Sequence, residues 1–108
     1  MQETICQAIH EKRLLMVHHN KGGRTFRRVV EPYLLFATKA DNLVLHSWQV
    51  EGQSDKTSPP DWCNLSLSDL SKVTPLERFY DQPQPGYNPQ SPQFYRVLCH
   101  VPLEMVRA

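Results

Sequence analysis

A basic segment near the N-terminus carries the side chains best suited to holding an anion. It contains, in order, His18, His19, Lys21, Arg24, Arg27 and Arg28. Seven Lys or Arg but only two acidic residues lie between His10 and Lys39. Guanidinium and ammonium groups donate charge-assisted hydrogen bonds to phosphate and carboxylate. The segment therefore predicts either a binding site for an anionic ligand or a solvated hairpin edge, whose charges prevent sheet-to-sheet aggregation.

Residues 43–50 alternate so that two possible ligand contacts share one face of a strand. His46 and Trp48 lie on one face with two valines, whereas Gln49 lies on the other with two leucines and a serine. If the first face is concave, Trp48 offers a stacking plane and His46 a hydrogen-bond donor, which suits a nucleobase or another planar ligand. If that face points into the hydrophobic core, Trp48 packs there and does not contact a ligand. Trp62 follows a Pro-Pro-Asp loop, which predicts partial exposure.

Other chemistry finds little support in the sequence. The only adjacent metal-ligand pairs are His18-His19 and Cys99-His100. Neighbours on a strand point to opposite faces, so neither pair chelates one ion easily, and no metal is predicted. No nucleophile elbow, glycine-rich phosphate loop or spaced carboxylate pair is visible. We therefore predict a binding protein without cofactor rather than an enzyme.

Composition bounds the remaining possibilities. The 108 residues suffice for one domain with one core. Twelve Lys and Arg against eleven Asp and Glu give a net charge of +1, so any electrostatic attraction must be local. Cys6, Cys63 and Cys99 are odd in number and far apart, which predicts reduced thiols and a cytoplasmic protein. The N-terminus does not resemble a leader sequence and the sequence has no long apolar stretch, so contact with a membrane is not predicted.

Hydrophobic periodicity predicts one helix followed by strands. Ile5, Ala8 and Ile9 recur at helical spacing, which predicts a short helix ending near Lys12. The rest of the first half is predicted to be extended. It begins with a hairpin of two strands that turns at residues 20–23. A corner at Glu31-Pro32 follows, and two further strand-like runs come after it. These strand-like runs are Leu14 to His19, Arg24 to Val30, Tyr33 to Thr38 and Leu43 to Val50.

The second half combines short strands with loops. A polar loop is predicted from Glu51 to Asp61, followed by short strands at 62–67 and 70–76. Four prolines between Asp81 and Pro92 predict an extended tether, ordered against the sheet through Tyr87. A final strand is predicted at residues 93–101. Five to six short strands with one helix indicate a mainly β, partly open barrel spanning about residues 13–80.

Several of these segments together resemble WYL domains. The similarity covers residues 5–80, and Arg28-Val29-Val30-Glu31-Pro32 is its most specific part. WYL domains are small Sm-like or SH3-like β-barrels, found mostly in bacterial transcriptional regulators and defence-associated proteins, where they bind ligands and in several cases nucleic acid. The resemblance thus implies such a barrel in a short member of the family. The other segments that carry it are Ala8-Ile9, Leu15 to Val17, Leu45 to Gln49, Trp62 and Phe79.

The chain also departs from the family pattern. The Trp-Tyr-Leu tripeptide is replaced by Asn42 to Leu45, and two ligand-facing arginines are replaced within Cys63 to Ser66. His19 stands where a tyrosine is usual. The regulators carry a winged-helix domain before the barrel, for which these residues leave no room, so the chain is not expected to be a complete transcription factor.

Two functional hypotheses follow from the residues and the resemblance. The first is a ligand-sensing or regulatory module that binds an anionic ligand such as a nucleotide or single-stranded nucleic acid. The second is a protein-interaction domain, or a homodimer, in which a strand edge pairs with a partner, and the loss of the two arginines favours it. The ligand-binding residues predicted for the first are His19, Arg24, Arg27, Arg28, His46, Trp48, Gln49 and Trp62.

Overall fold

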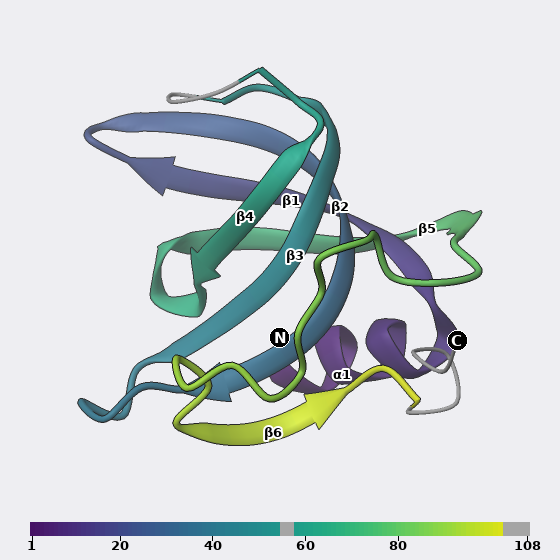
Figure 1. Ribbon diagram of the computed structural model, residues 1–108. Helices are drawn as coiled ribbons and strands as arrows, with labels where there is room; N and C mark the ends of the chain where they lie inside the picture. Colours follow the sequence, from purple (N-terminus) through teal and green to yellow (C-terminus); the bar gives the residue numbers. More distant parts are fainter. Residues whose placement is uncertain (55–57, 103–108) are drawn as a thin grey trace.

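The computed structural model describes residues 1–54 and 58–102. Strands dominate this part of the chain, and one helix precedes them (Figure 1). The prediction of a mainly β fold with one N-terminal helix is confirmed. In chain order the elements are α1 (Gln2–Glu11), β1 (Arg13–Lys21), β2 (Arg24–Ala37), β3 (Leu43–Gly52), β4 (Asp61–Ser66), the 3-10 turn η1 (Leu67–Asp69), β5 (Leu70–Phe79) and β6 (Arg96–His100).

The strands form one antiparallel sheet. Its order is β4-β3-β2-β1-β5, and β6 pairs with β2 beside this path. In Figure 1, β3 and β4 cross in front of β1 and β5, so the sheet curls strongly. Among the described strands β4 and β5 do not pair with each other, and the sheet is not closed.

The first hairpin follows the prediction closely. Lys21 pairs with Arg24 across the turn, and the two residues between them are glycines. Gly22 and Gly23 have φ angles of 59° and 78°. Two consecutive positive φ angles match the twist of a tight antiparallel hairpin, and glycine adopts them without strain. The turn therefore fixes the register of β1 against β2.

The predicted corner at Glu31-Pro32 lies inside one strand rather than between two strands. β2 continues through Pro32 to Ala37, with register shifts against β3 on both sides of it. Along one edge, β2 pairs with β1 as far as Val30 and with β6 from Leu34 onward. Pro32 falls between these two partners, where its missing N–H removes no ladder bond on that edge. The proline thus marks the bend of a continuous strand.

The helix covers one end of the sheet with the face that its periodicity predicts. Ile5, Ala8 and Ile9 are almost fully buried. They join a core of aliphatic and aromatic side chains from every strand. Lys12 closes the helix in the left-handed conformation, with a φ angle of 58°. The chain changes direction there, and β1 begins at the next residue, Arg13.

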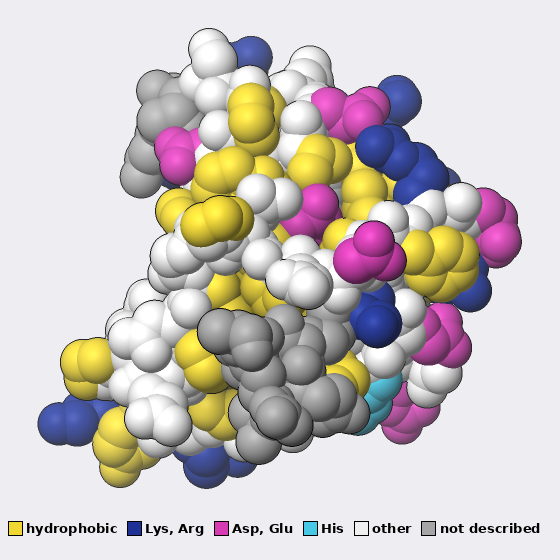
Figure 2. All heavy atoms as spheres, turned by 45° about the vertical axis from the view of Figure 1, so that its right-hand side comes forward, with side chains coloured by type: hydrophobic (Ala, Val, Ile, Leu, Met, Phe, Trp, Pro, Cys, Tyr) yellow, Lys and Arg dark blue, Asp and Glu magenta, His cyan; other side chains and the backbone are white. Residues whose placement is uncertain are grey.

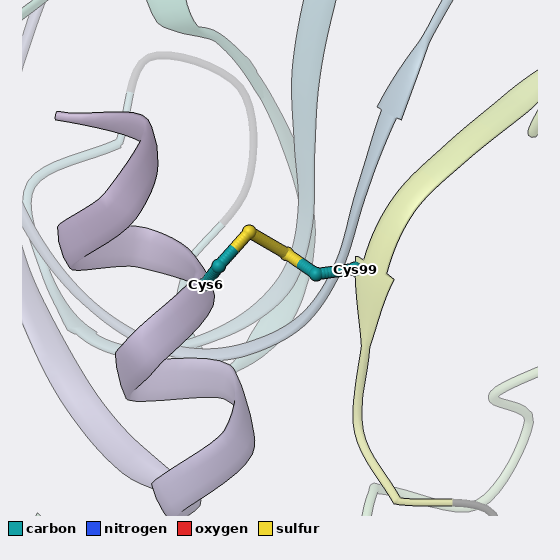
Figure 3. Close-up of a disulfide and its surroundings, with 2 residues drawn as sticks. All are labelled: Cys6 and Cys99. Atoms are coloured by element: carbon teal, nitrogen blue, oxygen red, sulfur yellow. A yellow bond between two sulfur atoms is a disulfide. The ribbon is translucent and has the colours of Figure 1, made fainter.

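A disulfide corrects the prediction that the cysteines are reduced thiols. Cys6 of α1 and Cys99 of β6 are bonded, with their Cα atoms 5.8 Å apart (Figure 3). Cys63 is not part of this disulfide. Disulfides are rare in reducing cytosol. The bond therefore removes the argument from cysteine usage for a cytoplasmic location.

The tail, residues 80–95, connects β5 to β6 and passes in front of β2 and β3 in Figure 1. Tyr80 begins it, donating its N–H to the Lys12 carbonyl at 2.9 Å and its hydroxyl to the Pro32 carbonyl at 2.5 Å. Tyr87 packs against Tyr33, with ring centroids 5.2 Å apart. The strand after the tail is shorter than predicted, because only Arg96–His100 pairs with β2.

Surface charges are mixed rather than segregated. On the face shown in Figure 2, Lys and Arg side chains alternate with Asp and Glu around a band of hydrophobic side chains. In the described part of the chain, the exposed Arg78 and Arg96 pair with Glu51 and Asp41, and the half-buried Arg13 pairs with Glu77. A functional attraction for anions must therefore come from a local group of residues.

Candidate functional site

The structure divides the predicted site residues between two faces of the sheet. Arg28 and His19 lie beside Gln49 on one face. His46 and Trp48 instead join an aromatic cluster on the other face. Trp62, on edge strand β4, belongs to that cluster and also lines the cavity beside Arg28. The two remaining residues, Arg24 and Arg27, are exposed near the hairpin end of β2. A single surface holding all eight residues is therefore not formed.

The first group lines a cavity of about 320 Å³, which we call the charged cavity. Residues of β1, β2, β3 and β4 contribute to it, together with Ser54 and Pro59 of the β3–β4 connection. Its basic residues lie on β1 and β2, and Asp61 of β4 also lines it. The lining residues that matter below are His19, Lys21, Arg28, Gln49, Asp61 and Cys63.

Arg28 is the most constrained of these residues, with only 3% of its surface exposed. Its Nη1 donates to Gln49 Oε1 at 2.9 Å and to the Gln53 carbonyl at 3.1 Å. Its Nε and Nη2 lie 3.4 Å and 3.3 Å from His19 Nδ1. A proton on Nδ1 would face these donors, so Nδ1 is the acceptor and Nε2 carries the proton. The guanidinium thus has a fixed orientation inside the sheet.

Gln49 and Phe26 complete the support of this arginine. The Gln49 amide nitrogen donates to the carbonyls of Glu51 and Gln53, at 3.2 Å and 3.0 Å, which fixes the oxygen toward Arg28. The Phe26 ring lies between two cations, with its centroid 5.2 Å from Arg28 Cζ and 4.9 Å from Arg24 Cζ. Such contacts stabilise a guanidinium without neutralising it. Phe26 is therefore the aromatic side chain on which Arg24 and Arg28 of the basic hairpin pack.

Gly52 allows the chain to bring the Gln53 carbonyl to Arg28. Its φ angle is +106°, and a Cβ there would lie 2.4 Å from the Arg27 carbonyl oxygen. Only glycine, which has no Cβ, can occupy a position this close to the Arg27 carbonyl. Gln53 then donates its N–H to the same carbonyl at 2.7 Å. A register shift between β2 and β3 at Val29 accompanies the bend.

Sequence reasoning missed Asp61 and Cys63 as parts of the charged cavity, and the Gln53 carbonyl as a partner of Arg28. Asp61 pairs with Gln49 across β3 and β4, and its carboxylate also accepts the Trp62 N–H at 2.8 Å. Alternation along β4 would place Asp61 and Cys63 on one face. Nothing local in the sequence says that this face meets Arg28, because the pairing joins distant segments.

On the opposite face, Trp62 lies at the centre of an aromatic cluster. The His46 ring stacks on it at 5.1 Å with an interplanar angle of 8°, and Trp48 meets it edge-on at 5.0 Å. Tyr33 of β2 packs against Trp62, and Tyr87 of the tail packs against Tyr33, so the cluster extends from β4 to the tail. Burial lowers the pKa of His46, although a 2.7 Å contact from its Nδ1 to Asn64 Oδ1 partly opposes that effect. His46 is therefore held toward its neutral form.

A buried polar network joins the tail to β2. The Tyr33 hydroxyl donates to the Glu31 carboxylate and accepts the Gln84 N–H at 2.9 Å. Burial, reinforced for Tyr33 by the hydrogen bond to Glu31, raises the pKa of Tyr33 and Tyr80 well above the usual tyrosine value. Burial also raises the pKa of Tyr87 to about 12. All three hydroxyls are therefore neutral at physiological pH, and those of Tyr33 and Tyr80 act as structural hydrogen-bond donors.

Comparison of the chain with protein-family models, curated proteins and solved structures found no match. Among the described residues, no three His, Cys, Asp or Glu side chains gather closely enough to hold a metal ion. Within the same residues, no helix has the length and apolar character needed to cross a membrane.

Proposed function

We propose that the chain is a ligand-sensing or regulatory binding module of the WYL type, without catalytic activity. In this proposal the curled sheet is a partly open Sm-like or SH3-like barrel, and its charged cavity holds an anionic ligand such as a nucleotide or a phosphate of single-stranded nucleic acid. The observation that carries the proposal is the buried guanidinium of Arg28, held by Gln49 and the Gln53 carbonyl at a cavity that also contains Lys21.

The electrostatic argument favours an anion over a neutral ligand. A buried cation loses hydration and interacts strongly across a medium of low dielectric, so an anion in the cavity gains more from Arg28 than from an exposed arginine. The fixed orientation of the guanidinium also lowers the entropy lost on binding. Lys21 adds a second positive charge.

Each lining residue has a role in this proposal. Arg28 and the Nε2–H of His19 donate to phosphate or carboxylate oxygens. Asp61 accepts a hydrogen bond from a hydroxyl or amino group elsewhere on the ligand, which excludes ligands that are anionic throughout. A sugar phosphate or nucleotide has both kinds of group.

The direct test is fluorescence anisotropy of a short labelled single-stranded oligonucleotide at low salt, with unlabelled nucleotide as competitor. Replacing Arg28 by Met should weaken binding at least about tenfold, because a charge-assisted contact contributes about 1.5–3 kcal/mol. Arg27→Met is the matched control, since it makes the same change at the next residue, which is exposed on the opposite face of β2 and does not line the charged cavity. Its effect should be small.

The folded state of each variant must be measured separately, because Arg28 also has structural contacts. Arg28→Lys keeps the charge but loses the forked donor geometry, so it should bind with intermediate affinity. Absence of wild-type binding up to about 100 μM, the weak end of non-specific affinities, would overturn the nucleic-acid form of the proposal.

A partner-binding role is the second candidate, and one observation favours it. β5 ends the sheet and pairs with β1 alone among the described strands, while most of its side chains are exposed. Phe79, at its end, is 56% exposed. Such an edge can accept a strand from another protein or from a second copy of this chain. Light scattering across a concentration series tests the homodimer form.

A further inference from the structure

A second cavity lies between the tail and β4, on the face opposite the charged cavity. It has a volume of about 370 Å³, and we call it the tail cavity. β3 and β4 supply one wall, and tail residues 86–94 supply the other. The side chains used in the argument are His46, Trp62, Asn64, Asn88, Ser91 and Gln93.

The tail cavity differs from the charged cavity in its lack of charge. Of the described residues that line it, none is Asp, Glu, Lys or Arg. His46 is its only titratable ring, and burial lowers the pKa of that ring. A ligand group that carries a net charge would lose hydration there without gaining a counter-charge. The tail cavity therefore suits an uncharged polar group.

Its amides are oriented by a short chain of hydrogen bonds. Asn64 Nδ2 donates to Gln93 Oε1 at 3.3 Å, so Asn64 Oδ1 turns toward His46 Nδ1, 2.7 Å away. In this arrangement Nδ1 of the neutral ring carries the proton, and Nε2 is left as an acceptor. Asn88 uses its Oδ1 to accept the Gln90 N–H at 3.0 Å.

These bonds leave a defined set of groups for a ligand. Within the described part of the chain, the amide nitrogens of Asn88 and Gln93, the Ser91 hydroxyl and His46 Nε2 make no hydrogen bond to protein. The two amide nitrogens donate, His46 Nε2 accepts, and the Ser91 hydroxyl can do either. A nitrogen heterocycle such as adenine offers the complement, with several ring acceptors and one exocyclic donor group.

Aromatic side chains frame the same space. Trp62 and Phe94 line the tail cavity, and both pack on the His46 ring, with centroids 5.1 Å away in each case. Gly86 lies beside the Trp62 indole, where an added Cβ would be in ordinary van der Waals contact, 3.6 Å from Cζ2. Aromatic walls with amide groups at the rim are typical of sites that take a flat, uncharged ring.

We propose that the tail cavity binds a nucleobase. Trp62, Cys63 and Asn64 of edge strand β4 line both cavities, so a single strand that passes around this edge reaches both. The base in the tail cavity then belongs to a nucleotide near the one whose phosphate occupies the charged cavity. This arrangement on a strand rests on the proposed function, whereas binding of a base does not.

The test uses adenosine, which carries no phosphate, titrated into the ¹⁵N-labelled wild-type protein. Adenosine should shift the side-chain amide signals of Asn64, Asn88 and Gln93, and ribose alone should not. Ser91→Leu fills the tail cavity and should weaken adenosine binding about tenfold or more, the size of one lost stacking contact. Ser71→Leu, the same change on the exposed surface of β5, should bind adenosine as the wild type does.

The outcomes separate this proposal from the proposed function. Oligonucleotide binding that depends on Arg28, combined with no amide shifts from adenosine, overturns the base site alone. Amide shifts from adenosine that persist in Arg28→Met support the base site whether or not the charged cavity binds phosphate. Equal shifts from ribose and adenosine overturn the proposal, since the base is then not the recognised group. The wild-type titration decides the matter even if Ser91→Leu fails to fold.

Discussion

The Nη1 atom of Arg28 and the Oε1 atom of Gln49 are 2.9 Å apart on neighbouring strands, and both residues are 3% exposed. Each residue depends on the other, because a buried guanidinium needs acceptors and a buried amide needs a fixed partner. The sequence separation of the pair is 21 residues. Their contact therefore forms only when β2 and β3 are in register.

Replacing Gln49 by Leu should lower both stability and anion affinity. The change leaves Arg28 with one acceptor fewer and the Gln53 carbonyl with one donor fewer, at a cost of about 1–3 kcal/mol. Urea unfolding measures the stability, and the anisotropy assay measures the affinity. Gln82→Leu, the same change at an exposed tail position, is the control and should alter neither quantity by much. Equal effects of the two changes would contradict the role given to Gln49.

Gly52→Ala should be far more destabilising than Gly23→Ala. Both glycines have positive φ angles, so both substitutions introduce backbone strain of about 1 kcal/mol. A Cβ at Gly52 also meets the Arg27 carbonyl at 2.4 Å, whereas a Cβ at Gly23 has nothing within 4 Å. We expect a loss of about 3 kcal/mol at Gly52 by urea unfolding, toward the upper end of local strain costs. Similar losses at the two positions would argue that the close approach is easily relieved.

Breaking the disulfide between Cys6 and Cys99 should destabilise the fold, whereas replacing Cys63, which lies outside it, should not have this effect. Cys6 and Cys99 have a sequence separation of 93, and a closed loop of that length stabilises a protein by about 4.7 kcal/mol in the chain-entropy treatment. The double variant Cys6→Ser, Cys99→Ser should show this loss in urea, whereas Cys63→Ser should not. Thiol titration of the unfolded protein should find one reactive group before reduction and three after it.

Local patterns predicted local structure well. Ile5, Ala8 and Ile9 identify the buried helical face, because their spacing alone determines which residues share it. Gly22-Gly23 identifies the hairpin, because few residues accept two positive φ angles. Each of these signals lies within a few residues of the feature that it predicts.

Features that join distant segments were not predictable in the same way. The disulfide requires that β6 return beside β2 beneath α1, and no spacing of cysteines contains that information. Alternation placed His46 and Trp48 together and Gln49 apart from them, as the structure has it. It could not show that Gln49 lies with Arg28, since the relation between the faces of β2 and β3 depends on bulges at Val29 and Tyr33.

Stability should fall on acidification through protonation of His46. Burial lowers its pKa in the folded state, so the unfolded state binds the proton more readily. The stabilisation is complete above the unfolded pKa of about 6.5 and is lost as the pH falls from there through the folded pKa. His46→Gln should show a smaller loss between about pH 7.5 and about pH 5.5, because glutamine does not titrate. Urea unfolding at the two pH values tests this, and an equal loss in both proteins would assign the pH dependence to other groups.

Removing the hydroxyl of Tyr87 should leave stability unchanged or raise it, in contrast to the same change at Tyr33. Among the described residues, the Tyr87 hydroxyl is buried without a hydrogen-bond partner, so its burial costs hydration that nothing offsets. Tyr87→Phe keeps the ring against Tyr33 and removes only that cost, which predicts a change between zero and a gain of about 1 kcal/mol. Tyr33→Phe instead removes a donor to the Glu31 carboxylate and an acceptor for the Gln84 N–H, and should cost about 1–3 kcal/mol.

Because the two substitutions delete the same atom from neighbouring rings, their difference in urea unfolding isolates the hydrogen bonds from the packing. A loss at Tyr87 as large as that at Tyr33 would mean that its hydroxyl has a partner in solution, and the tail would then be held to the sheet by a polar contact as well as by its aromatic ring.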